Sequence, residues 1–121
     1  MKKILLTGAT GFIGSNIYKL LISDGYDVDC IVRKKNNKFK RTIVHDLNKP
    51  FRRKVYAKYD CIIHAAAISP IDSKNDASIF YNNISSTQNL VDFANQYKVK
   101  KIVFMSSISL YGDIQHKIIN N

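Results

Sequence analysis

T-G-A-T-G-F-I-G, from Thr7 to Gly14, is the stretch of this chain that decides its fold. It directly follows the apolar run Ile4–Leu6 and directly precedes a stretch with the apolar spacing of a helix. A strand, a glycine-rich turn and a helix in this order form the corner at which a Rossmann-type domain holds the pyrophosphate of a dinucleotide. The stretch therefore predicts a dinucleotide site. The alternative is a turn that merely connects a strand to a helix.

Each of the three glycines has its own mechanical task in that corner. Gly8 can adopt the backbone conformation of the tight turn, and Gly11 lets the main chain approach the phosphates without an intervening side chain. Gly14 lets the helix pack close to the strand. The N-terminus of the helix then offers unpaired N–H groups and a partial positive charge to the anion.

The length of 121 residues predicts a single domain over 1–121 that is small for a complete dinucleotide enzyme. No apolar run approaches the roughly 18 residues that cross a bilayer, so we expect no membrane span. Lys2 and Lys3 lead into a first strand rather than a signal peptide. Cys30 and Cys61 lie in predicted strands and are expected to be buried, with no metal ligands and no disulfide. These features fit a cytoplasmic protein.

The formal net charge of +10 is concentrated in two predicted connections, 33–41 and 49–58. Every acid in the chain is an aspartate. Three explanations stay open, in order of preference: a solvated surface, a site for an anionic small ligand, and a nucleic-acid footprint.

Apolar periodicity predicts alternating strands and helices. Strands are expected at Lys3–Thr7, Asp27–Val32, Thr42–His45, Cys61–His64 and Ile102–Ser106. Helices are expected at Phe12–Ser23 and Asp76–Tyr97, the second with an apolar stripe at Phe80, Ile84, Thr87, Val91 and Ala94. A loop is expected at Ile68–Asn75, and Ile108–Asn121 receives no assignment. The alternation predicts an α/β fold, a Rossmann-type parallel sheet of strand order 3-2-1-4-5 with helices on both faces, and a ligand at the carboxyl ends of strands 1 and 4.

Further motifs follow the glycine turn in a fixed order. They are His45-Asp46-Leu47, His64-Ala65-Ala66-Ala67, Asn83–Leu90, Met105-Ser106-Ser107 and Leu110-Tyr111-Gly112. Together they resemble the N-terminal part of the extended short-chain dehydrogenases/reductases, the NAD(P)-dependent epimerase/dehydratase family, which acts largely on nucleotide sugars. The resemblance covers nearly the whole chain. It implies a truncated member that lacks the C-terminal strands and the substrate domain.

The resemblance implies a role for each matched position. Gly8, Thr10, Gly11, Phe12, Ile13 and Gly14 match the turn that binds the pyrophosphate. Asp46 matches an acid that accepts a hydrogen bond from the adenine amino group, and Leu47 lies beside the ring. Ala65, Ala66 and Ala67 match the small-residue turn that passes the cofactor ribose.

The same resemblance extends to the reacting end of the cofactor. Asn83 matches a helix asparagine that fixes the active-site backbone, and Ser106 matches the end of the fifth strand near the nicotinamide. Ser107 matches the hydroxyl that hydrogen-bonds the reacting sugar oxygen. Plain structural alternatives stay open: an Asx turn at Asp46, close packing of the alanines, and solvated roles for Asn83 and Ser107. His64 is expected to be a structural residue at the strand end rather than a catalyst.

The end of the second strand departs from the pattern of NAD-preferring members, which place there an acid that binds the ribose 2′-hydroxyl. Here Val32 occupies that place, and Arg33, Lys34 and Lys35 follow it. Guanidinium and ammonium groups attract a 2′-phosphate, so the sequence favours NADP over NAD, with Arg33 as a cofactor contact.

In this family the serine works with a Tyr-x-x-x-Lys pair further along the chain, which exchanges a proton with the sugar hydroxyl. The 121 residues contain no such pair after Ser107. Tyr97 and Lys101 have the spacing but lie before the fifth strand, toward the wrong rim of the sheet. The resemblance thus implies a cofactor-binding portion that is inactive alone, with hydride transfer at a sugar carbon belonging to full-length relatives. The alternative is a non-catalytic dinucleotide-binding sensor or partner-binding module. The exposed edge of the fifth strand predicts self-association.

Overall fold

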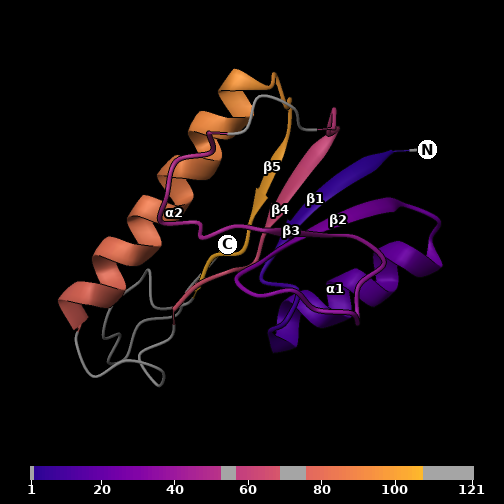
Figure 1. Cartoon of the computed structure of the whole chain (residues 1–121), viewed down its shortest axis with the longest axis horizontal. Coiled ribbons are helices and arrows are strands. Elements are labelled where there is room, and N and C mark those ends of the chain that lie inside the picture. The colour runs from indigo at the N-terminus through magenta and orange to yellow at the C-terminus, as the bar shows by residue number, and fades with distance from the viewer. Residues whose placement is uncertain (1, 53–56, 69–75, 108–121) are drawn as a thin grey trace, which may run out of the picture.

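The computed structural model describes residues 2–52, 57–68 and 76–107. Its strands are β1 (Lys3–Thr7), β2 (Asp27–Val32), β3 (Thr42–Val44), β4 (Cys61–His64) and β5 (Ile102–Phe104), and its helices are α1 (Phe12–Ser23) and α2 (Asp76–Gln96). The strands form a parallel sheet in the order β3-β2-β1-β4-β5, which confirms the predicted Rossmann-type α/β fold (Figure 1). Within the described residues, neither helix is both long and apolar enough to cross a membrane.

The predicted boundaries differ from the observed ones only at three ends. The third and fifth strands stop at Val44 and Phe104, although the amides of His45 and Met105 still bond to the neighbouring strand. Helix α2 ends at Gln96 rather than one residue later. The predicted loop lies outside the described residues except for Ile68, as does the unassigned segment 108–121.

Alternating side chains of the central strands build a core on each face of the sheet. Leu5 and Ile62 are fully buried on the face that Phe93 of α2 covers. Leu6 and Cys30 are fully buried on the opposite face. Ile17, Tyr18 and Leu21 of α1 pack there. The two helices therefore cover opposite faces, as predicted, and both cysteines are buried and free.

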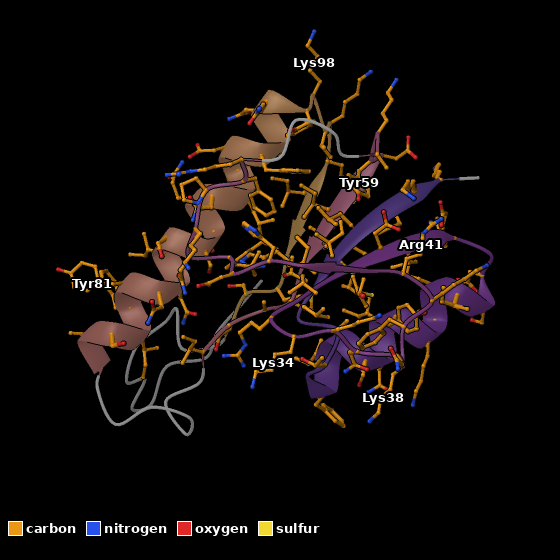
Figure 2. All side chains as sticks on the ribbon, viewed as in Figure 1. Lys34, Lys38, Arg41, Tyr59, Tyr81 and Lys98 are labelled. Atoms are coloured by element: carbon orange, nitrogen blue, oxygen red, sulfur yellow. The ribbon has the colours of Figure 1, made fainter. Side chains whose placement is uncertain are left out.

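The predicted apolar stripe of α2 is wrong at Phe80, Ile84 and Val91, whereas Thr87 is half-buried and Ala94 is buried. The buried positions of the helix are Ser86, Leu90, Phe93 and Ala94. Phe80, Ile84 and Val91 are exposed, and Tyr81 points away from the sheet (Figure 2). Apolar residues occur on both sides of this helix, so their spacing alone did not identify the side that packs on the sheet.

A cluster of compensating charges joins the strands on the amino-end side of the sheet. Asp29 of β2 accepts hydrogen bonds from the Tyr59 hydroxyl at 2.8 Å, from Arg41 Nε at 2.6 Å and from Lys3 Nζ at 3.3 Å. Lys3 and Arg41 also pair with Asp27. Figure 2 labels Arg41 and Tyr59, which reach β2 from two separate segments. Two cations and two anions thus leave no unpaired charge in the cluster, which is the condition for keeping charged groups half-buried.

We expect Asp29→Asn to lower the free energy of unfolding by about 2–3 kcal/mol. That is below the roughly 3–5 kcal/mol for one partner of a fully buried pair, because Arg41 is half exposed. Urea unfolding followed by circular dichroism measures the change. Asp24→Asn at the exposed C-terminal end of α1 is the matched control and should leave stability unchanged. Equal stability of the two variants would contradict the role of the cluster.

Candidate functional site

A cavity of about 640 Å³ opens at the carboxyl ends of the central strands. It is lined by Gly8, Thr10, Gly11, Ile31, Val32, Arg33, His45, Asp46, Leu47, Asn48, Ala65, Ala66, Ala67, Ile68, Ser78, Asn82, Asn83 and Ser86. The cavity lies where the chain order of the sheet reverses, between β1 and β4, which is where open parallel sheets of this kind bind ligands.

The β1–α1 corner is built from two backbone approaches that only glycine permits. Gly8 has φ +75°, and a Cβ there would overlap the main chain of Ala65 and Ala66. A Cβ at Gly14 would overlap the carbonyl of Gly8. The amide of Gly11 closes the turn on the Gly8 carbonyl at 2.9 Å. The glycine pattern therefore brings α1 against the end of β1 and beside the turn that follows β4.

The N-terminus of α1 has the character of an anion site. Gly11 is the N-cap residue, and no side-chain hydrogen bond caps the helix there. The first turn of this helix contains no acidic residue. Backbone N–H groups and the positive end of the helix dipole are thus turned toward the cavity edge at Thr10 and Gly11.

Five of the candidate residues do not line the cavity. Phe12 and Ile13 begin α1 with exposed side chains, and Gly14 acts through its close packing. Ser106 and Ser107 follow β5 and are exposed. The remaining candidates line it together: Gly8, Thr10, Gly11, Arg33, Asp46, Leu47, Ala65, Ala66, Ala67 and Asn83.

Asp46 combines two properties that the sequence posed as alternatives. Its Oδ1 accepts the amide of Asn48 at 3.1 Å, which is an Asx turn, and the residue also lines the cavity. Helix α2 holds this segment from the other side. Asn89 Nδ2 donates to the Leu47 carbonyl at 2.8 Å, and the Ser85 hydroxyl donates to Asn48 Oδ1 at 2.6 Å.

Asn83 fixes the backbone of the segment after β4 with two hydrogen bonds. Its Oδ1 accepts from the Ile68 amide at 2.8 Å, and its Nδ2 donates to the Ile68 carbonyl at 3.1 Å. Asn83 is therefore bonded to the chain rather than solvated. Together with Ser85 and Asn89, Asn83 makes one face of α2 a support for both loops of the cavity.

Three polar residues outside the set of candidate site residues, Thr7, His64 and Thr87, connect the ends of β1 and β4 to α2. His64 is 2% exposed, and its Nδ1 lies 2.7 Å from Thr7 Oγ1. Its Nε2 lies 3.1 Å from Thr87 Oγ1. Burial lowers the pKa of His64, which favours the neutral ring. Thr7 and His64 are paired in the register of β1 and β4. A polar residue at the end of each of two adjacent apolar strands is the sequence feature from which this contact could have been predicted.

The end of β2 presents a cation to the cavity and no acid. Val32 is buried, and the exposed Arg33 lines the cavity directly after it. Asp27 and Asp29 lie earlier in the strand and are occupied by Lys3 and Arg41. Lys34 and Lys38 are exposed in the connection that follows (Figure 2).

Tyr97 and Lys101 lie away from this cavity, as expected. The Tyr97 ring packs on Phe93 at 4.6 Å between centroids, and Lys101 directly precedes the amino end of β5. In the described part of the chain, no three His, Cys, Asp or Glu side chains gather as metal ligands would.

Comparison with known proteins matches residues 4–121 to the sequence model of the NAD dependent epimerase/dehydratase family. The chain is 32% identical to the UDP-glucose 4-epimerase of Schizosaccharomyces pombe, over 91% of this chain and 36% of that protein. It is 33% identical to the dTDP-glucose 4,6-dehydratase of Streptomyces griseus, over 93% of this chain and 40% of that protein. The solved structure of the ADP-L-glycero-D-manno-heptose-6-epimerase of Helicobacter pylori superposes with a TM-score of 0.81 at 26% identity, over 98% of this chain and 43% of that one. The chain thus spans less than half the length of these relatives.

We expect Gly8→Ala to lower stability by more than about 3 kcal/mol, because a positive φ and a backbone overlap act together. Gly25→Ala is the matched control. Gly25 has nearly the same φ, +78°, but a Cβ there meets nothing within 4 Å. It should cost only the about 1–2 kcal/mol of a left-handed alanine. Urea unfolding of both variants tests the difference, and equal losses would mean that the turn is not pressed against the β4 segment.

Proposed function

The chain belongs to the NAD-dependent epimerase/dehydratase family, and we propose that the cavity at its β1–α1 corner is where the dinucleotide binds. The observation that carries this proposal is the pair of glycine contacts that leaves the N-terminus of α1 beside the cavity, free of side-chain caps and acids. A diphosphate is the ligand group that such a helix end attracts. The proposal treats residues 1–121 as one incomplete NAD(P)-binding domain.

The proposed contacts follow the length of the cavity. Gly8, Thr10 and Gly11 would hold the pyrophosphate, with Phe12, Ile13 and Gly14 forming the first turn of the helix behind it. Asp46 and Leu47 would contact the adenine. Both line the cavity, and the Asx turn at Asp46 uses only the Oδ1 atom of its carboxylate. The alanine turn, Asn83 and Ser106 would accommodate the ribose and nicotinamide end. When bound, the nicotinamide would supply a hydride acceptor, and the residues of this chain bind and orient it.

Arg33 is the proposed determinant of cofactor choice. It follows a buried valine at the end of β2 and lines the cavity with an exposed guanidinium. A guanidinium attracts the 2′-phosphate of NADP, whereas the acid that would favour the 2′-hydroxyl of NAD is not at this position. We therefore propose that NADP binds more tightly than NAD.

A nucleotide sugar is the proposed substrate of a full-length relative, and its support is that the similar proteins named above are a UDP-glucose epimerase and a dTDP-glucose dehydratase. Ser107 would hydrogen-bond the reacting sugar oxygen. General acid–base catalysis needs a group within hydrogen-bond reach of the transferred proton. No Tyr-x-x-x-Lys follows Ser107 in the 121 residues, so we propose that they bind the cofactor without transferring hydride.

The second candidate is a non-catalytic module whose occupancy by dinucleotide controls a partner, a function that the same cavity could serve. A stable complex that forms only with cofactor, and without turnover, would favour this candidate over the enzyme portion.

We expect the chain to bind NADPH more tightly than NADH, and Arg33→Ala to weaken NADPH binding about tenfold while changing NADH binding little. Titration followed by nucleotide fluorescence or calorimetry measures both. Lys100→Ala, an exposed residue before the amino end of β5, removes the same charge outside the cavity and should have no effect. Absence of saturable binding of either nucleotide would refute the dinucleotide site. Equal affinities would refute only the preference for NADP.

We also propose that β5 mediates self-association of this chain. It forms one edge of the described sheet, and Ile102, Val103 and Phe104 are 38%, 37% and 56% exposed. An apolar edge with unpaired backbone groups promotes strand-to-strand contact, and a lysine on the edge suppresses it.

Sedimentation velocity at increasing concentration should therefore show dimers or larger species for the wild-type chain and monomers for Val103→Lys. Val44→Lys, on the opposite edge strand β3, is the matched control and should associate like the wild type. A wild-type chain that stays monomeric, or a Val103→Lys variant that associates unchanged, would contradict the role of β5.

A further inference from the structure

We propose that His64 is a positioning residue whose single ring proton lies on Nε2, so that it links the turn at Ala66 to Asn83 of α2 in one directed series of hydrogen bonds. The series exists in the chain without ligand. Its consequence for cofactor affinity rests on the proposed dinucleotide site.

The direction of the series follows from where each proton can go. The Thr87 hydroxyl donates to the Asn83 carbonyl at 2.8 Å, so its oxygen can only accept from the ring. His64 Nε2 must therefore carry a proton and donate it across 3.1 Å. In a neutral ring Nδ1 is then an acceptor, and the Thr7 hydroxyl donates to it across 2.7 Å. Thr7 Oγ1 in turn accepts the Ala66 amide at 3.2 Å.

The opposite tautomer leaves a buried proton without an acceptor. With the proton on Nδ1, Thr7 Oγ1 would accept from both the ring and the Ala66 amide, while its own hydroxyl proton would have no acceptor among the contacts of the described residues. Thr7 is completely buried, so a hydroxyl proton without an acceptor there would be strongly unfavourable. A doubly protonated ring creates the same conflict at Nδ1. With the proton on Nε2, the Ala66 amide, the Thr7 hydroxyl, the ring N–H of His64 and the Thr87 hydroxyl each have an acceptor.

Both ends of the series line the proposed cofactor cavity. Ala66 belongs to the turn after β4, and Asn83 clamps the backbone of Ile68 in the same segment. His64 therefore holds this turn at Ala66 through Thr7, while Asn83 holds it at Ile68. A residue in this place acts on the cofactor through the turn and does not touch it.

The neutral ring has a pH dependence of known sign. Burial lowers the pKa of His64 from its ordinary value of 6.5. Stability that depends on the neutral ring is fully present above pH 6.5 and is lost as the pH falls through the lowered pKa of the folded state. The groups that contact the ring in the described part of the chain are Thr7, Thr87 and the ring of Phe104 at 5.5 Å, none of which titrates in this range.

The ring nitrogens of the ligand-free 121-residue chain decide the tautomer directly. Nitrogen-15 NMR at neutral pH should give the pattern of a protonated Nε2 and an unprotonated Nδ1 for His64. A proton on Nδ1, or on both nitrogens, overturns the proposal whether or not the chain binds a dinucleotide. In the same samples, Thr7→Val should speed hydrogen exchange of the Ala66 amide at least about tenfold, because that amide loses its acceptor. Unchanged exchange also overturns the proposal.

Cofactor titration tests the consequence for binding. Thr7→Val should weaken NAD(P)H binding about tenfold, which corresponds to about 1.4 kcal/mol and lies within the cost of an unsatisfied buried donor. Thr7→Ser restores the hydroxyl and should recover most of the affinity, which a loss of packing alone would not allow. Ser23→Ala, which removes an exposed hydroxyl at the end of α1, is the control and should bind like the wild type.

A pH series separates the ring from other titrating groups. His64→Asn keeps an acceptor for Thr7 and cannot be protonated, so its affinity should not share the decline of the wild type as the pH falls through the lowered pKa of His64. His45 also lines the cavity but is unchanged in this variant, so the difference between the profiles reports His64 alone. Identical profiles overturn the positioning role. If the wild-type chain binds no dinucleotide at any pH, the proposed function fails, and the tautomer and the Ala66 exchange still decide the series itself.

Discussion

The close approach of Gly14 to the carbonyl of Gly8 is the constraint on which the rest of this structure depends. Because no Cβ stands between them, α1 can begin directly beside the end of β1. The same turn presses Gly8 against the main chain of Ala65 and Ala66, so the segments after β1 and β4 are in contact where the chain order reverses. The cavity is the space that remains in front of these contacts. Any side chain placed in this corner would separate the helix, the turn and the β4 segment together.

Helix α2 has a second, less visible task besides covering one face of the sheet. Its polar residues hold the two loops that bound the cavity: Asn83 holds Ile68, while Asn89 and Ser85 hold Leu47 and Asn48. The His64 series adds a third connection, through Thr87, to the end of the sheet. The proposed adenine and nicotinamide ends of the site are thus supported by one rigid element. A cofactor-binding portion of a larger family member would gain preformed loops in this way.

The sequence predicted the strands, their order and the glycine corner because these depend on local spacing and on backbone conformation. It predicted packing positions of α2 wrongly at Phe80, Ile84 and Val91, since apolar residues occur on both sides of that helix and only the sheet determines which of them are buried. It selected Asp46 and Asn83 through a family resemblance, without their hydrogen-bond partners. It did not predict the hydrogen bonds of Thr7, Thr87 and Asn89, whose partners lie 23 to 59 residues away in the chain. Hydrogen bonds between residues so far apart produce no repeating pattern in the sequence from which they could be predicted.

The place of β1 in the sheet has a consequence for how the chain forms during synthesis. β1 is translated before both of its neighbours, yet it lies at the centre of the sheet, between β2 and β4. Its second neighbour, β4, is not made until the ribosome has passed His64. Until then the apolar residues Ile4, Leu5 and Leu6 lie in a strand with one edge unpaired, and an unpaired strand edge makes a nascent chain prone to aggregation. A ribosome-associated chaperone that shields the first few dozen residues would therefore protect this protein when its central strand is still waiting for a partner.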